Sequence, residues 1–287
     1  MNSKHFRVPH DEKIKLADYD TAFTGDFKSK KEAGKKLKKD IRRLAELQDV
    51  LYAQDTYALL VIFQALDAAG KDSTIKHVMS GINPQGCQVF SFKAPSQEEL
   101  DHDYLWRCTT RLPERGRIGI FNRSYYEEVL VTRVHPEILD FQKLPPESMK
   151  DIWKRRYEEI NNFEEHLYGS GTRIVKFFLH VSKEEQKRRF LDRIERPDKN
   201  WKFSASDMKE RARWDDYQKA YQDMFNHTST KHAPWHIIPA DHKWFMRGAV
   251  AEILIETLES LDLQYPVVSD AHRAELQDIR TQLENEA

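Results

Sequence analysis

The segment FQALDAAGKDST, residues 63–74, contains the pair Gly70-Lys71, which fits the centre of the phosphate-binding pattern G-x-x-x-x-G-K-[ST]. A loop of this type between a strand and a helix binds anions through backbone N–H groups and the helix N-terminus. Lys71 would place its ammonium group on a transferred phosphoryl group, and Ser73 and Thr74 are the nearby hydroxyls. The alternative is a chance Gly-Lys pair in an ordinary loop.

Three residues of this loop are unusual for a phosphate site. Ala65 replaces the first glycine, and Asp72 replaces the Ser or Thr that normally helps to hold magnesium. Asp67 adds a carboxylate, whose charge is tolerable beside phosphates only with a metal ion between them. The alternative role of Asp67 is to cap the next helix or turn. The loop is therefore a decayed site, a chance match, or a site for another phosphate substrate.

A second group of polar residues follows an apolar run in IFNRSYYEEV, residues 120–129. Ligand sites of α/β proteins gather at the carboxyl ends of strands, where P-loop enzymes commonly place an Asp that assists magnesium. This chain has Asn122, a weaker neutral ligand, and then Arg123, whose planar guanidinium suits phosphate oxygens. Ser124 and Glu127 match the S-x-x-E capping box, so Glu127 is either a helix cap or a carboxylate of the site.

The stretch from residue 187 to residue 213 is strongly basic, with ten Lys and Arg against five Asp and Glu. Arg189 and Arg193 share a helix face at spacing i, i+4, and Pro197 ends the helix. A basic flap over a phosphate site would neutralise charge in the transition state and exclude water. The alternative is a pair of solvated, charged helices.

The remaining sequence must supply elements that position these residues. Apolar runs predict five strands, at 57–65, 87–92, 117–121, 173–181 and 236–240. Helices are predicted at 29–53, 73–82, 96–111, 124–134, 147–168, 183–195, 207–226 and 244–262. Strands that alternate with helices indicate a doubly wound parallel α/β sheet. No break in composition marks a second domain, so residues 1–287 are expected to form one domain, with an extended arm at 1–27.

Composition narrows the class of protein. A formal net charge of -1, with 32% charged residues, indicates a globular protein without a uniformly basic coat, and no nucleic-acid module is visible. The two cysteines exclude a disulfide framework and fit a reducing cytoplasm, which is the expected location. No apolar run approaches the roughly 18 residues of a membrane span, and the N-terminal residues lack the apolar core expected of a secretory signal. Neither a nucleic-acid nor a membrane partner is expected.

Taken in order, these segments resemble the second family of polyphosphate kinases. The resemblance rests on LDAAGKDSTIKHVMSGINPQGCQVFSFKAP, GRIGIFNRSYYEEVLVTRVHPE and RRFLDRIERPDKNWKFSASDMKER, and it spans about residues 20–265. It implies a P-loop kinase-like domain with a five-stranded parallel sheet, helices on both faces, a helical lid at about 187–213 and a C-terminal tail at 265–287. The family pattern contains D-A-A-G-K, so the loop is not decayed.

The resemblance also implies roles for single residues. Asp67, Lys71 and Arg123 are the expected catalytic residues. Asp67, Asn122 and Glu127 are the expected ligands of Mg²⁺, with Mn²⁺ as an alternative. Asn122 departs from the Asp of other subgroups, which makes Glu127 the compensating carboxylate. The expected phosphate- and nucleotide-binding residues are Ala68, Ala69, Gly70, Asp72, Ser73, Thr74, Asn122, Arg133, Arg189 and Arg193.

The implied reaction is the reversible transfer of the terminal phosphoryl group of inorganic polyphosphate to AMP and ADP, which gives ADP and ATP. The stretch FNRSYYEEVLVTRVHPE resembles the subgroup that accepts both nucleotides, and a homodimer or homotetramer is expected. Two other functions remain open, an ATP-dependent nucleoside or nucleotide kinase and a non-catalytic nucleotide or polyphosphate sensor. Asp72 after the lysine argues against the first. The presence of Asp67, Lys71 and Arg123 together argues against the second.

Overall fold

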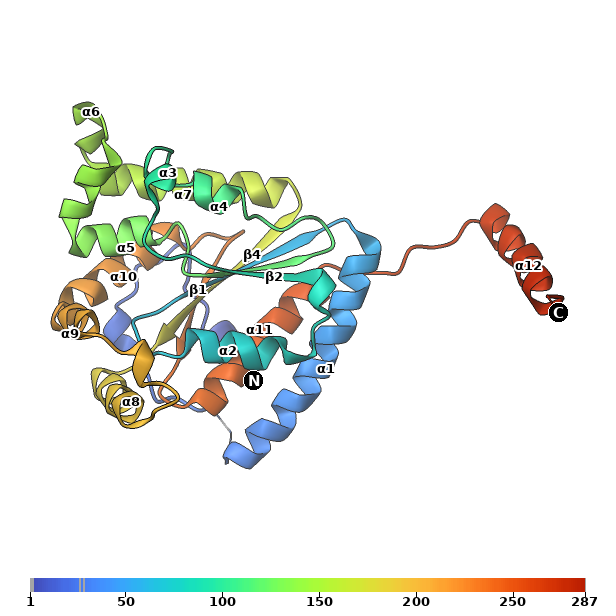
Figure 1. Ribbon diagram of the computed structural model, residues 1–287, viewed down its shortest axis with the longest axis horizontal. Coiled ribbons are helices and arrows are strands. Elements are labelled where there is room, and N and C mark those ends of the chain that lie inside the picture. Colours follow the sequence, from blue (N-terminus) through green and yellow to red (C-terminus); the bar gives the residue numbers. More distant parts are fainter. Residues whose placement is uncertain (1–2, 26, 28, 287) are drawn as a thin grey trace.

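The computed structural model describes residues 3–25, 27 and 29–286, apart from the side chain of residue 202. At its centre lies a parallel sheet with the strand order β2-β3-β1-β4-β5 (Figure 1). The strands are β1 (Ala58–Gln64), β2 (Cys87–Ser91), β3 (Ile118–Asn122), β4 (Thr172–His180) and β5 (Trp235–Pro239). The predicted class, a five-stranded parallel α/β sheet, is confirmed.

The central strand β1 is buried along its whole length because it is apolar on both faces. Leu59, Val61 and Phe63 belong to the core on one face of the sheet. Leu60 and Ile62 belong to the core on the other face, as the alternation of side chains along a strand requires. β1 pairs with β3 on one side and β4 on the other, so its carboxyl end lies in the middle of the sheet edge.

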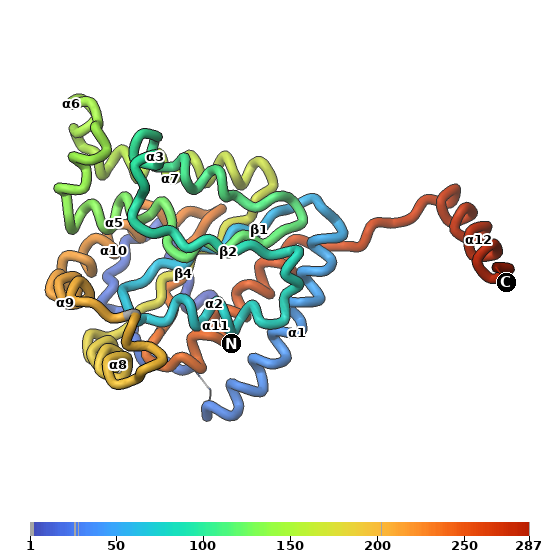
Figure 2. Tube along the Cα trace, viewed as in Figure 1, coloured from blue at the N-terminus to red at the C-terminus, as the bar shows by residue number. Residues whose placement is uncertain are grey.

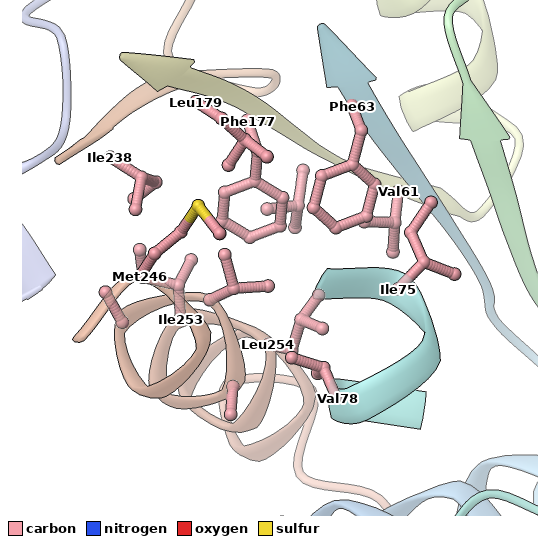
Figure 3. Close-up of a cluster of buried hydrophobic side chains, with 14 of the residues drawn as sticks. Val61, Phe63, Ile75, Val78, Phe177, Leu179, Ile238, Met246, Ile253 and Leu254 are labelled. Atoms are coloured by element: carbon pink, nitrogen blue, oxygen red, sulfur yellow. The ribbon is translucent and has the colours of Figure 1, made fainter. Parts of the chain in front are cut away.

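Three helices cover one face of the sheet, α1 (Lys30–Gln54), α2 (Lys71–Val78) and α11 (Lys243–Glu259) (Figure 1). Figure 3 shows apolar side chains of α2 and α11 packed together against the strands. The residues labelled there are Val61, Phe63, Ile75, Val78, Phe177, Leu179, Ile238, Met246, Ile253 and Leu254. This packing fixes α2, and therefore the loop that precedes it, against the end of β1.

The other face is covered by α5 (Glu127–Val134), α7 (Ile152–Gly169) and α10 (Trp214–Thr228). A charged pair lies within this layer: Lys176 of β4 donates to Glu164 of α7 at 2.6 Å, and neither side chain is exposed. The hydroxyls of Tyr125 and Tyr126 donate to the second oxygen of Glu164, both at 2.8 Å. The network satisfies the charges and ties α7 to the segment that follows β3.

Several predicted helices begin or break elsewhere. The stretch 96–111 holds only α3 (Gln97–Leu100) and α4 (Trp106–Thr109), because the Asp103 side chain accepts from the N–H of Leu105 at 2.9 Å and competes with helical bonding. The predicted helix at 147–168 is divided into α6 (Pro146–Met149) and α7, because Asp151 has φ +49°. The predicted helix at 207–226 is divided at Arg213 into α9 (Ala205–Ala212) and α10.

The basic segment contains α8 (Lys183–Glu195) and α9, which lie at the carboxyl edge of the sheet (Figure 1). The described residues also form short 3₁₀ helices. They are η1 (Ser3–His5), η2 (Leu16–Asp18), η3 (Met79–Gly81), η4 (Pro84–Gly86), η5 (Pro136–Gln142) and η6 (Asn200–Lys202). Within the described ranges no helix is both long enough and apolar enough to cross a membrane.

The two ends of the chain behave differently. Of the expected arm, residues 1–2 and 26 lie outside the described residues. Residues 6–8 of the described part run along β5, where Val8 N–H donates to Trp235 O and Ile237 N–H donates to Phe6 O, both at 2.8 Å. Of the expected C-terminal tail, residue 287 lies outside the described residues. The rest includes a further helix, α12 (Asp270–Glu284), which projects from the body (Figure 2).

Candidate active site

The phosphate loop connects the end of β1 to the start of α2. Gly70 is the N-cap of α2 and has φ +112°, which glycine adopts without strain. A Cβ atom at Gly70 would lie 3.3 Å from Met246 Cε, so the close approach of α11 also favours glycine. Ala68 has φ +61°, a conformation that residues with a side chain rarely adopt. Contacts with the rest of the protein must therefore hold this loop in shape.

Lys71 begins α2 and is only 9% exposed. Its Nζ donates to Ala65 O at 2.7 Å, beneath the loop. Burial, followed by the charge of Arg123, lowers the pKa of Lys71 to about 8. A phosphate bound at the loop would favour the charged form, so Lys71 is suited to bind an anionic substrate.

Arg123 connects two carboxylates of the predicted site. Its Nη2 lies 3.2 Å from Asp67 Oδ1, and its Nη1 lies 3.4 Å from Glu127 Oε2. The charge of Glu127, and after it that of Asp67, raises the pKa of Arg123. Arg123 has φ +66°, and its backbone N–H donates to Phe63 O at 3.0 Å. A strained turn directly after β3 thus brings these three side chains together.

Glu127 does not form the capping box that the S-x-x-E pattern suggested. The N-cap of α5 is Tyr126, which makes no capping bond, because the turn at Arg123 delays the helix to Glu127 itself. Ser124 Oγ instead accepts from the N–H of Tyr126 at 3.2 Å. Glu127 Oε1 accepts from Gln64 Nε2 at 2.6 Å. The capping interpretation is therefore wrong, and the Glu127 carboxylate faces the site.

Asn122, the last residue of β3, lies at the mouth of the loop. Its Nδ2 donates to Asp72 Oδ1 at 2.8 Å and to Ser91 Oγ at 3.4 Å. A direct contact between Asn122 and a metal ion stays a prediction.

The two loop hydroxyls have different surroundings. Thr74 is buried, and its Oγ1 donates to Gly70 O at 3.0 Å, which closes the first turn of α2. Ser73 Oγ accepts from Arg247 Nη2 of α11 at 2.7 Å. Ser73 also lines a cavity that lies over the loop, so Ser73 is better placed than Thr74 to contact a ligand.

A cavity of about 780 Å³ lies over the loop, between the ends of β2 and β3, the basic segment and the start of α11. Its cationic lining residues are Lys71, Lys93, Arg123, Arg189, Arg193, Lys199 and Lys243. Its acidic lining residues are Asp67, Asp72, Asp192, Asp198 and Asp207. Burial, followed by the charge of Arg189, lowers the pKa of Lys243 to about 8. The cations outnumber the carboxylates, which suits a polyanion.

A second cavity of about 340 Å³ shares three residues, Asp67, Arg123 and Asp207, with the first. Glu127 lines this second cavity. Its other walls include aromatic and apolar side chains, namely Leu130, Val131, Trp214, Tyr217 and Tyr221. The site therefore has a charged compartment and an aromatic compartment that meet at Asp67 and Arg123.

The predicted arginine ligands occupy three kinds of position. Arg193 lies in the wall of the large cavity. Arg189 is 5% exposed, and its guanidinium donates to the carbonyl oxygens of Ala68 and Ala69 in the loop. Arg133 lies in the last turn of α5, pairs with Asp223 at 2.8 Å and lines neither of these two cavities. Contact of these side chains with phosphates stays a prediction.

Sequence reasoning missed Gln64, Lys243 and Arg247. The strand-end rule that identified Asn122 also applies to Lys243, because it begins the helix that follows β5. Arg247 lies one turn further along the same helix, so the same rule could have identified it. Gln64 gave no signal, because a single polar residue at the end of an apolar run resembles an ordinary strand terminus.

Among the described residues, no group of three or more His, Cys, Asp and Glu side chains is arranged to hold a metal ion. Asp67 and Glu127 are nevertheless two carboxylates that share one guanidinium. Mg²⁺ is usually held by one or two carboxylates together with waters and substrate phosphates. The donor set therefore fits a magnesium ion that is completed by the substrate.

Comparison with known proteins agrees with this geometry. The family model described as Polyphosphate kinase 2 (PPK2) matches residues 27–266. The chain is 53% identical over 285 residues to the ADP-polyphosphate phosphotransferase of Rhodopseudomonas palustris, and 99% of each chain is covered. It is 44% identical over 264 residues to the AMP/ADP-polyphosphate phosphotransferase of Meiothermus ruber, covering 92% of this chain and 95% of that relative.

A solved structure gives the same result. The crystal structure of Polyphosphate Kinase 2 from Arthrobacter aurescens matches with a TM-score of 0.86 and 40% sequence identity, covering 96% of both chains. The resemblance inferred from the sequence is thus confirmed, and the chain belongs to the polyphosphate kinase 2 family.

Proposed function

We propose that this enzyme transfers the terminal phosphoryl group of inorganic polyphosphate to AMP and ADP. The observation that carries the proposal is that Asp67 and Arg123 line both the charged and the aromatic compartment. A phosphoryl group that passes between two substrates must be contacted at such a junction. The family and the names of its similar members support the same reaction.

The two compartments differ in a way that matches the two substrates. The large cavity, with its surplus of cations, suits the polyphosphate chain, which carries charge along its whole length. The smaller cavity offers Trp214, Tyr217 and Tyr221, whose flat rings suit a nucleotide base. Its junction with Asp67 and Arg123 would receive the acceptor phosphate.

Asp67 and Glu127 would hold Mg²⁺, and Mn²⁺ is the alternative ion because it shares the preference for oxygen ligands. Bound there, the ion would supply charge neutralisation for the phosphate oxygens. Metal binding by these residues is a proposal that rests on their shared contact with Arg123.

The chemistry asks little covalent help from the protein. The bond between the terminal phosphorus and its bridging oxygen breaks, and a bond to a phosphate oxygen of the nucleotide forms. That oxygen is already ionised near pH 7, because the second pKa of a phosphate monoester is about 6. Arg123 and Lys71 would stabilise charge on the transferred group, and the loop would hold it in line. The reverse reaction exchanges similar bonds and is therefore also expected.

The test is chromatography of nucleotides after incubation of the enzyme with AMP, polyphosphate and Mg²⁺, in the absence of ATP. ADP should form first, and ATP should follow. Matched reactions lack polyphosphate or contain Asp67→Asn, and both should leave AMP unchanged. Persistent AMP, with ready consumption of ATP as donor to an added nucleoside or AMP, would overturn the proposal in favour of an ATP-dependent kinase.

A homodimer or homotetramer and a cytoplasmic location, both expected from the sequence, stay predictions. Light scattering of the purified protein would measure the number of chains in the assembly.

A further inference from the structure

Side chains of α8 hold three successive carbonyl oxygens of the phosphate loop. Gln186 Nε2 donates to Asp67 O at 3.0 Å. One turn later, Arg189 Nη1 donates to Ala68 O at 3.0 Å and to Ala69 O at 2.7 Å. Both residues are nearly inaccessible, at 2% and 5% exposure. The contacts are thus built into the protein interior and do not depend on a surface side chain finding its partner.

Arg189 has no N–H group left for a substrate. A guanidinium has five N–H donors. Beyond the two bonds to the loop, Nη2 donates to Ala240 O at 2.6 Å and to Asp241 O at 3.1 Å. Nε donates to Glu185 Oε1 at 2.7 Å. Although Arg189 borders the large cavity, all five donors are used within the protein, so a bond to phosphate would require the loss of one of them.

Asp241, whose carbonyl oxygen accepts from Arg189, is itself held by two other segments of the chain. Asp241 follows β5, and its Oδ1 accepts from the N–H of Ser182, the N-cap of α8, at 2.8 Å. Its Oδ2 accepts from Thr21 Oγ1 of the N-terminal arm at 2.8 Å. Gln186 is held in turn by Arg211 of α9, whose Nη1 donates to Gln186 Oε1 at 2.7 Å. The side chains of Arg189 and Gln186, which bind the loop, are therefore also held in place by residues outside the loop.

Holding the carbonyls determines where the amides point. In a trans peptide the C=O and the following N–H point in opposite directions. With Ala69 O turned towards Arg189, the N–H of Gly70 points to the opposite side, and Gly70 lines the large cavity. The same restraint holds Ala68 at its unfavourable φ of +61°.

We propose that Gln186 and Arg189, which border the smaller and the larger cavity, are positioning residues that pre-organise the phosphate loop through its backbone carbonyls and do not bind the transferred phosphoryl group. α8 is then a fixed support of the loop, and any lid movement begins after Glu195, where α8 ends. The tests that measure turnover rest on the proposed phosphoryl transfer, whereas the test by hydrogen exchange does not.

Two substitutions separate positioning from direct phosphate contact. Arg189→Lys keeps the positive charge but cannot supply five donors in one plane. Gln186→Met keeps the volume and removes the amide. Under the proposal, both should lower kcat by about tenfold or more, since small displacements of a reacting group carry large rate costs. Direct phosphate contact by Arg189 instead predicts a mild effect of Arg189→Lys and none of Gln186→Met. Arg188→Lys, on the exposed side of the same helix, is the matched control and should stay within about twofold of wild type.

Hydrogen exchange of the protein without substrate gives a readout that needs no turnover. Amides of residues 64–75 should exchange faster in Arg189→Lys and in Gln186→Met, while amides of β4 should be unchanged. A normal kcat in both variants would overturn the proposal, as would a lowered kcat with unchanged exchange in the loop. If Arg189→Lys fails to fold, Gln186→Met decides alone. If wild type shows no polyphosphate-dependent transfer, the proposed function fails, and the exchange result still tests the positioning.

Discussion

Asn122 Nδ2 donates to Asp72 Oδ1 at 2.8 Å, so two of the side chains that depart from the usual P-loop pattern contact each other. One departure puts a carboxylate where a hydroxyl is usual, and the other puts an amide where a carboxylate is usual. The amide can donate to the carboxylate, whereas two carboxylates at this distance would repel. The exchange of residue types at the two positions is thus complementary.

Asn122→Asp should be tolerated when Mg²⁺ is present, but not in its absence. Two carboxylates at hydrogen-bond distance repel by about 1 kcal/mol in a watery environment, and a hydrogen bond of about 1 kcal/mol is lost. Thermal unfolding with EDTA should therefore show a Tm a few degrees below wild type, and saturating Mg²⁺ should restore it. Asn122→Ala is the control that removes the bond without adding charge. Equal Tm values for the two variants in EDTA would contradict the expectation.

Asp67→Asn should nearly abolish transfer while the protein stays folded. The change keeps the shape of the side chain but removes the charge that faces Arg123 and the expected metal. A loss of several kcal/mol of transition-state stabilisation corresponds to a rate decrease of about a thousandfold, at 1.36 kcal/mol per tenfold. Initial rates of ADP formation from AMP give the measurement, and circular dichroism provides the check on folding. Activity above a tenth of wild type would argue against a metal-binding role.

Glu127→Gln should raise the Mg²⁺ concentration needed for half-maximal rate. The amide oxygen can still accept from Gln64, so the local structure is retained, but the charge facing Arg123 is lost. Titration of Mg²⁺ at fixed substrate measures the effect. Glu158→Gln, which removes a charge from an exposed position of α7, is the control for general loss of acidity. Wild-type turnover of Glu127→Gln at limiting Mg²⁺ would exclude Glu127 from the metal site.

The value of kcat/KM for polyphosphate should fall above about pH 8, because Lys71 loses its proton there in the free enzyme. The acceptor adds no change in this range, since its phosphate is ionised by pH 7. Bound phosphate favours the ammonium, so kcat should fall less. Lys243 has a pKa of about 8 as well, and Lys243→Met shows which lysine carries the decrease. A flat kcat/KM from pH 7 to about 9.5 would contradict this assignment.

The depressed pKa of Lys71, which should lower kcat/KM as the pH rises, should raise the stability of the fold over the same range. The pKa of Lys71 is depressed from 10.5 to about 8, so between these values the unfolded chain binds more protons than the folded one. The contribution of Lys71 to the free energy of unfolding therefore rises with pH across this window. Comparison of urea denaturation of wild type and Lys71→Met at pH 7.5 and pH 9.5 isolates this contribution, and a larger gain with pH in Lys71→Met would contradict it.

Breaking the buried pair of Lys176 and Glu164 should be the costliest of these changes for folding. Lys176→Met leaves Glu164 fully buried without its cation, and such losses cost about 3–5 kcal/mol. The double variant Lys176→Met with Glu164→Gln should recover part of this cost, because no charge remains unpaired. Urea denaturation measures all three proteins. A double variant no more stable than the single one would show that the hydrogen bonds, and not the charge, dominate.

The sequence predicted the sheet well because its strands are apolar runs bounded by polar residues. β1, for example, was expected at 57–65 and lies at Ala58–Gln64. The order of the strands was not predicted, since periodicity does not say which strands pair. Helix interruptions were missed where one residue sets the backbone, as at Asp151 with φ +49°.

Some residues of the candidate site could be identified from the sequence, and others could not. Asp67, Lys71 and Arg123 could be identified because a short loop and a strand end carry their signals. The role of Arg189 could not be inferred from spacing, because an arginine that binds phosphate and one that binds carbonyl oxygens look alike in a sequence. Only the arrangement of five acceptors around the guanidinium distinguishes them.

The contact between the N-terminal arm and β5 limits the order in which the chain can fold during its synthesis. Ser229 Oγ donates to Val8 O at 2.9 Å, and these residues are 221 positions apart. Phe6 and Val8 therefore leave the ribosome long before the strand that they cover, and they remain unpaired while most of the chain is made. Contacts between such distant positions form slowly, and until they form the edge of the growing sheet is open to other nascent chains. The arm therefore cannot take its place against the sheet until residues 235–239, which form β5, have been made.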